Sequence, residues 1–189
     1  LNRLRLPHAQ RGAVSLVERQ LEMQRERIRG MEEDITRLMS IARQNEHIFF
    51  ALNQLHLDLL AARQKTDIRL ALSAFANKMP HVHACNLLEF NHEAMGDNFT
   101  AIQMVLEHRL QGRHYYFGRL NRDEMATLFQ PGIHSVALLL ISHADQPLAL
   151  LAFGSQLDDH FQPSMDTLFI DHIAKVLALV LPRYGQQGC

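Results

Sequence analysis

The chain has 189 residues, of which 47% are hydrophobic and 21% charged, and its formal net charge is -1. This composition is typical of a globular protein and argues against extensive disorder, and the balanced charge favours neither nucleic acid nor membrane as a partner. Nine arginines and six acidic residues lie within residues 1–45. A basic arm that touches phosphate is one explanation of this excess, but a solvated coiled-coil face explains it better.

The first predicted element is a long helix with an uninterrupted heptad repeat over residues 14–59. Eleven of its fourteen a and d positions are apolar, so one stripe of the helix is expected to be buried against another helix. Ser15 and Glu18 predict a capping box at its start. We therefore predict a homodimer, whose interface includes Val17, Leu21, Ile28, Met31, Ile35, Leu38, Ala42 and Phe49.

The flanks of this heptad seam change along the helix. The e and g positions are mostly polar in the first half, whereas Met39, Ile41 and Ile48 make them apolar in the second half. A stripe this wide predicts packing against a globular domain, or in a four-helix arrangement, from about residue 39 onward. The predicted division is an N-terminal arm and coiled-coil stalk, residues 1–45, and a domain, residues 46–189, with the helix of residues 46–64 shared between them.

The rest of the chain alternates between helix and strand patterns. The predicted elements are a helix at 68–75, a strand at 83–91, a helix at 99–110, a strand at 115–120, a helix at 121–129, a strand at 133–142, a strand at 148–154 and a helix at 163–183. Asn121 and Glu124 predict a second capping box, and residues 145–147 predict a hairpin turn. This order is typical of an α+β domain with a mostly antiparallel sheet and helices gathered at one face.

Several segments, in the right order along nearly the whole chain, resemble the bacterial GAF-like family called domain of unknown function 484. They are residues 6–8, 12–20 and 42–46, then Gly118-Arg119-Leu120, Glu124 and Leu128-Phe129, and finally residues 154–169. The resemblance implies a GAF-like domain, a mostly antiparallel central sheet with flanking helices, preceded by the long N-terminal coiled-coil helix. It implies no particular activity or cofactor. GAF relatives bind cyclic nucleotides, bilins, haem or small metabolites between the sheet and its covering helices, but the pattern of the cyclic-nucleotide binders is absent here.

A candidate ligand pocket follows from residues 114–119, where aromatic side chains precede a cation. An arginine at this place would hold a carboxylate or phosphate in bidentate fashion. The alternative is that the aromatic rings fill the core while Arg119 pairs with Asp123 or Glu124. The candidate pocket residues are Tyr115, Phe117, Arg119, Phe129 and His134.

His81, His83 and Cys85 form a candidate metal site, because alternate residues of a strand share one face and these residue types suit zinc. Such a site lacks a fourth ligand, and Pro80 places His81 before the strand, so we predict no metal site. Cys85 on a strand is also a poor position for bilin attachment.

Residues 158–160 and 171–172 resemble fragments of acid/base chemistry. No Ser or Cys nucleophile has a partner at a meaningful spacing, and there is no Gly-rich phosphate loop. We therefore predict no catalytic residue and no enzymatic activity. His56 occupies an a position of the seam, where burial or a neighbour would move its titration near neutral pH. The better-supported alternative is a half-exposed histidine with satisfied hydrogen bonds.

The two cysteines, Cys85 and Cys189, provide no disulfide framework, and no signal peptide or membrane span is recognisable. We expect a cytoplasmic protein. The leading hypothesis is a non-enzymatic GAF-like regulatory or sensory module, homodimeric through the N-terminal and terminal helices, with an unidentified small molecule as candidate ligand. The alternatives are a structural or adaptor protein with a filled pocket that binds a protein partner through its basic N-terminal arm, and a metalloenzyme built on the His81, His83 and Cys85 set.

Overall fold

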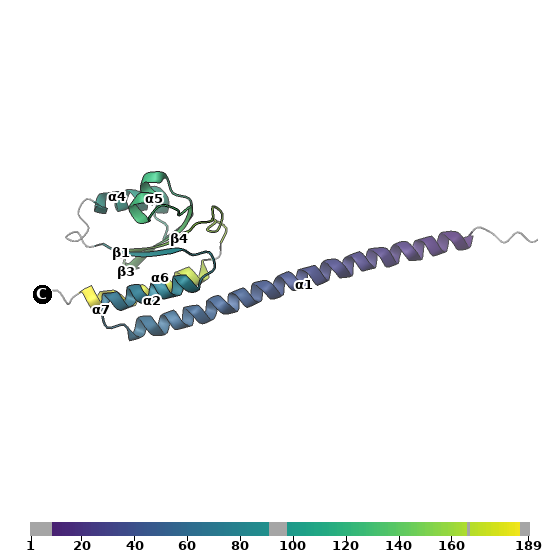
Figure 1. Ribbon diagram of the computed structural model, residues 1–189, viewed down its shortest axis with the longest axis horizontal. Helices are drawn as coiled ribbons and strands as arrows, with labels where there is room; N and C mark the ends of the chain where they lie inside the picture. The colour runs from purple at the N-terminus through teal and green to yellow at the C-terminus, as the bar shows by residue number, and fades with distance from the viewer. Residues whose placement is uncertain (1–8, 91–97, 166, 186–189) are drawn as a thin grey trace, which may run out of the picture. The chain divides into compact units, whose positions relative to one another are not determined.

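The computed structural model describes residues 9–90, 98–165 and 167–185 (Figure 1). Its elements in chain order are α1 (Ala9–Ala61), α2 (Lys65–Lys78), β1 (Ala84–Glu89), α4 (Asn98–Val105), the π-helix η1 (Leu106–Leu110), β2 (Tyr115–Gly118), α5 (Arg122–Leu128), β3 (Ser135–His143), β4 (Gln146–Ser155), α6 (Leu168–Val180) and α7 (Pro182–Gly185). The chain divides into two compact units, Leu1–His47 and Ile48–Cys189. The predicted α+β class, with an antiparallel sheet and a long N-terminal helix, is confirmed.

One four-stranded antiparallel sheet, in the order β1-β4-β3-β2, forms the centre of the second unit. Helices α2 and α6 lie on one face of this sheet and α4 and α5 on the other (Figure 1). The prediction that the helices gather at one face is wrong. The central strands β3 and β4 are apolar at consecutive positions because both of their faces are covered.

Side chains of the central strands alternate between two apolar cores, as the pleat of a strand requires. Ala137, Leu139 and Ile141 belong to the core on the α2 and α6 side. Val136 and Leu138 belong to the core on the α4 and α5 side. The second core carries the candidate site described below.

The last part of α1 belongs to the first of these cores. Its buried positions are Ala51, Leu52, Leu55 and Leu59. Met39, where the sequence predicts this packing to begin, is 53% exposed in the single chain, and the four-helix arrangement stays a prediction. A heptad pattern shows that a helix face is apolar, but it does not show what covers that face.

Two predicted helix starts are wrong and one is confirmed. Helix α1 begins at Ala9, so Ser15 lies inside it and does not cap it. Helix α6 begins at Leu168, five residues beyond Pro163, which lies in a turn. The capping box of α5 is confirmed: the Glu124 amide donates to Asn121 Oδ1 at 2.8 Å, and the Asn121 amide donates to Glu124 Oε2 at 3.0 Å.

The predicted hairpin is formed by β3 and β4, but its turn is tighter than expected. Only Ala144 and Asp145 connect the strands, with φ values of 48° and 61°. Two central residues with positive φ match the right-handed twist of paired strands. Gln146 and Pro147, which the sequence predicts in the turn, are the first two residues of β4.

Candidate functional site

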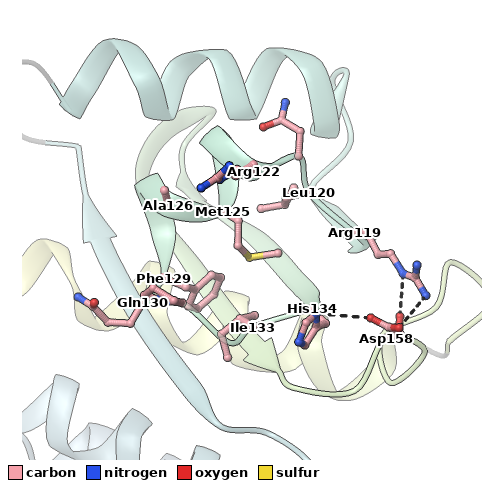
Figure 2. Close-up of a pocket in the computed structure, with 12 residues that line it drawn as sticks. Arg119, Leu120, Arg122, Met125, Ala126, Phe129, Gln130, Ile133, His134 and Asp158 are labelled. Carbon is pink, nitrogen blue, oxygen red and sulfur yellow. Dashed lines mark hydrogen bonds and ion pairs between the residues drawn. The ribbon is translucent and has the colours of Figure 1, made fainter.

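The candidate site is a pocket of about 650 Å³ on the α5 side of the sheet (Figure 2). It is formed by the segment before α5, the exposed side of α5, the segment leading into β3, and the loop after β4. Its lining residues are Arg119, Leu120, Asn121, Arg122, Met125, Ala126, Phe129, Gln130, Pro131, Ile133, His134 and Asp158. The volume lies within the range of about 300–1,000 Å³ that is typical of small-molecule sites.

A nearly buried ion pair fixes α5, which forms one wall of the pocket. Arg109 of η1 donates to the Glu124 carboxylate at 2.9 Å from Nε and lies 2.7 Å from it at a terminal nitrogen. Burial raises the pKa of Glu124, but the hydrogen bonds from Arg109 and from the Asn121 amide outweigh it, so this pKa lies below its ordinary value. The Arg109 guanidinium also lies over the Tyr116 ring, 5.8 Å from its centroid. These contacts hold the capped start of α5 in place.

Apolar side chains form the floor of the pocket. Phe129 is buried, and Met125 and Ile133 are half-buried beside it (Figure 2). Gly154 of β4 lies beneath them: a Cβ at this position would come within 2.9 Å of Ile133 and 3.1 Å of Phe129. The floor rests directly on the sheet because position 154 has no side chain.

Three polar side chains meet at one end of the pocket. Arg119 Nε donates to the backbone carbonyl of Asp158 at 3.1 Å, and its terminal nitrogen lies 3.7 Å from the Asp158 carboxylate. His134 Nδ1 lies 3.6 Å from the other carboxylate oxygen (Figure 2). All three side chains are more than half exposed, so these pairs contribute little to stability. The predicted alternative, in which Arg119 pairs with Asp123 or Glu124, is wrong.

The structure brings three of the five predicted pocket residues together and places the other two elsewhere. Arg119, Phe129 and His134 line the pocket. Phe117 is buried in the core on the opposite face of the sheet, where its ring stacks on Phe161, and Tyr115 lies beside it with ring centroids 5.6 Å apart. Alternation along β2 turns positions 115 and 117 away from α5, so these two residues do not line the pocket.

Sequence reasoning missed other lining residues, above all Arg122 and Asp158. Arg122 is the first residue of the capped helix α5, and the capping box was a usable signal for its position. In the sequence, Asp158 stands out only as part of residues 158–160, which resemble a fragment of acid/base chemistry. Its contact with Arg119 joins positions 39 residues apart in the chain, and no local pattern predicts such a contact.

The candidate metal residues do not come together as one set. His83 Nδ1 accepts a hydrogen bond from the Gln156 amide at 3.3 Å, whereas the His81 ring lies 5.6 Å from that of His160. Burial raises the pKa of the Cys85 thiol to about 12. Within residues 9–90, 98–165 and 167–185, no group of three or more His, Cys, Asp or Glu side chains is placed to hold a metal ion.

The remaining acid/base fragments have structural partners. The Thr167 hydroxyl donates to the Asp171 carboxylate at 3.1 Å at the start of α6. His172 lies beside His56 of α1, with ring centroids 4.9 Å apart. His56 Nε2 is buried and has no hydrogen-bond partner in the part of the chain that the structure describes.

The predicted dimer positions on α1 are exposed in the single chain. Ile35 is 57% exposed, Leu38 61% and Phe49 52%, and the other five predicted positions are exposed as well. None of the described helices is long and apolar enough to cross a membrane.

Comparison with known proteins supports the resemblance noted in the sequence. Residues 1–186 match a family described as protein of unknown function, DUF484. Uncharacterized protein YigA of Salmonella typhimurium is 29% identical over 194 residues, which cover 96% of this chain and 81% of that protein. The proteins of the same name from Escherichia coli K12 and Shigella flexneri are 28% and 27% identical over 192 residues, with the same coverage. The predicted family is therefore confirmed.

Proposed function

Because this chain belongs to the DUF484 family, whose function is unknown, we propose a function from its own structure: a non-enzymatic, GAF-like regulatory module that acts as a homodimer. In this proposal α1 associates with α1 of a second copy, and the pocket beside α5 binds a small molecule. Three observations support the proposal: the family resemblance, the antiparallel sheet with covering helices, and the exposed seam.

The observation that carries the proposal is the exposure of the apolar heptad seam on α1. Monomeric proteins rarely expose a long contiguous apolar surface without a partner for it. Here the apolar side chains repeat at a and d positions, which is the spacing of two helices that pack knobs into holes. A second copy of the same helix supplies the matching pattern, and symmetric self-association is the commonest form of oligomer.

Sedimentation velocity of the full chain tests the homodimer. We expect a dimer at micromolar concentration. The double variant Ile28→Lys, Ile35→Lys places charges at two a positions and should shift the chain to monomer. The matched control Glu33→Lys, Ser40→Lys adds lysines at f positions of the same heptads and should leave the dimer intact. A monomeric unmodified chain at this concentration would contradict the proposed homodimer.

The pocket supports the ligand-binding part of the proposal. It combines an apolar floor with a few polar groups at one end, which is the usual composition of a ligand site. The loop that carries Asp158 leads into α6, and α6 shares a core with the end of α1 through Ile173 and Leu177. A ligand that favours one arrangement of this loop would bias the helices that follow it, to the extent that its affinity differs between the two arrangements.

Native mass spectrometry of the purified protein tests whether the pocket retains a small molecule. Ala126 is exposed and lines the pocket, so Ala126→Trp should fill the space without disturbing the core. We expect a retained mass in the unmodified protein and its loss in Ala126→Trp. Ala74→Trp, on an exposed position of α2, is the control and should keep it. Equal retention in Ala126→Trp would place the molecule elsewhere.

A further inference from the structure

The charges that line the pocket are unequal. The lining includes two arginines, Arg119 and Arg122, and one carboxylate, Asp158. Asp158 pairs with Arg119, and within the described residues no carboxylate pairs with Arg122. The lining therefore carries a net positive charge beside an apolar floor.

The carboxylate of Asp158 lies between Arg119 and His134 (Figure 2). An arginine and a histidine that converge on one carboxylate form a set of donors suited to an anion. In the present arrangement the chain itself supplies that anion. Because the Asp158 side chain is 63% exposed, an incoming anion can replace it without opening the core.

The loop that carries Asp158 is held by other contacts. The buried Ser135 hydroxyl donates to the Leu157 carbonyl at 2.6 Å and accepts from the Phe161 amide at 3.3 Å. Arg119 Nε donates at 3.1 Å to the backbone carbonyl of Asp158 and not to its carboxylate. The carboxylate can therefore leave its position, or be removed by mutation, while the loop keeps its path.

We propose that the pocket binds an amphipathic organic anion, whose apolar body lies on the Met125, Phe129 and Ile133 floor and whose carboxylate or phosphate lies between Arg119 and His134, where the Asp158 carboxylate now lies. Asp158 competes with this ligand as an internal anion. The inference rests on the proposed ligand-binding function and adds the chemical class of the ligand.

Two fluorescent probes distinguish the contribution of a ligand's charge to binding from the contribution of its apolar body. Anilinonaphthalene sulfonate is an organic anion, and phenylnaphthylamine is the same aromatic body without the sulfonate. Ala126→Trp fills the pocket, so the binding of each probe that is lost in this variant is the binding that occurs in the pocket. We call this part the pocket component. We expect the anionic probe to bind this component more tightly than the neutral one, and the difference to shrink at high salt.

Two substitutions should then move the affinity of the anionic probe in opposite directions. Arg119→Gln should weaken it about two- to fivefold, and Asp158→Asn should strengthen it by a similar factor, since exposed charge pairs contribute about 0.2–1 kcal/mol. Neither should change binding of the neutral probe. Arg113→Gln removes an exposed arginine outside the pocket and is the control.

The outcomes distinguish this inference from the proposed function. If both probes lose binding in Ala126→Trp but neither responds to Arg119→Gln or Asp158→Asn, the pocket binds ligands and the anion inference is overturned. If neither probe is affected by Ala126→Trp, the ligand-binding function itself fails. Displacement by naphthoate or by naphthyl phosphate, with naphthalene methanol as the neutral control, shows whether the site favours a carboxylate or a phosphate.

Discussion

The imidazole rings of His56 and His172 lie with their centroids 4.9 Å apart, one on α1 and the other on α6. Burial, and then the neighbouring His172, lower the pKa of His56 below its ordinary value of 6.5. The unfolded chain therefore takes up a proton at a higher pH than the folded chain does. The contribution of His56 to stability is fully present above pH 6.5 and is lost as the pH falls below that value.

The pH dependence of unfolding tests this pair. We expect the urea midpoint of the protein to fall between about pH 7.5 and about pH 5.5, since histidines titrate in this range. His56→Leu should reduce that fall, because it removes the proton site and the unpaired buried nitrogen together. His143→Leu, at an exposed position, is the control. An unchanged fall in His56→Leu would show that other groups, such as His160, whose pKa is also lowered by burial and by His81 and His83, dominate.

Glu124→Gln tests the ion pair that fixes α5. The side chain of Glu124 is only 8% exposed and pairs with Arg109. Its replacement leaves the Arg109 guanidinium without its carboxylate and weakens the capping box, so the free energy of unfolding should fall by about 1–3 kcal/mol. Glu107→Gln, on the exposed side of η1, should change it little. Urea denaturation at neutral pH measures both, and equal effects would contradict a special role for Glu124.

Gly154→Ala tests the close approach of the pocket floor to the sheet. The added methyl group would meet Ile133 and Phe129 at distances shorter than normal contact. We expect a loss of about 1–3 kcal/mol in stability, as for other overpacked positions, and weaker binding of the neutral probe. Unchanged stability and binding would mean that the floor has room to move.

Gly30→Ala should increase stability, whereas Gly154→Ala should decrease it. Gly30 lies within α1, and a Cβ there would meet nothing within 4 Å. Alanine is favoured over glycine in a helix by about 1 kcal/mol. The thermal midpoint of the helical circular-dichroism signal should therefore rise, and a fall would contradict a helix at this position.

Cys85 should react slowly with thiol reagents in the folded protein. Burial raises its thiol pKa to about 12, so little thiolate exists near neutral pH. In the variant Cys189→Ser, Cys85 is the remaining thiol. We expect slow modification by Ellman's reagent at about pH 8 and fast modification in urea, since the thiolate is the reacting form. Fast reaction in buffer would show that β1 opens readily.

Much of the fold could be predicted from local patterns, because each strand and helix is encoded in neighbouring residues. The sequence predicts the apolar strands β3 and β4, the capping box of Asn121 and Glu124, and, from its heptad repeat, the long helix α1. It does not predict the starts of α1 and α6 correctly. Serine before a helical pattern and proline at a helix start are common signals, but here the residues before Ser15 are also helical and Pro163 lies in a turn.

The candidate site was predicted only in part because its residues come from distant segments. Arg119, Phe129 and His134 were identified near the expected pocket. Three successive aromatic residues, 115–117, give no polar and apolar alternation, so the sequence did not show which of them faces α5. Asp158 reaches Arg119 only once the β3–β4 hairpin is in place, and this contact depends on the completed sheet.

The burial of Leu52 and Leu59 inside their own domain has a consequence for how the chain folds. These two residues continue the d positions of the heptad, yet each is at most 5% exposed in a single copy. The domain thus completes its core without a second chain. Dilution of the proposed homodimer should therefore release folded monomers, unlike dilution of an obligate dimer, whose folding and association are one event.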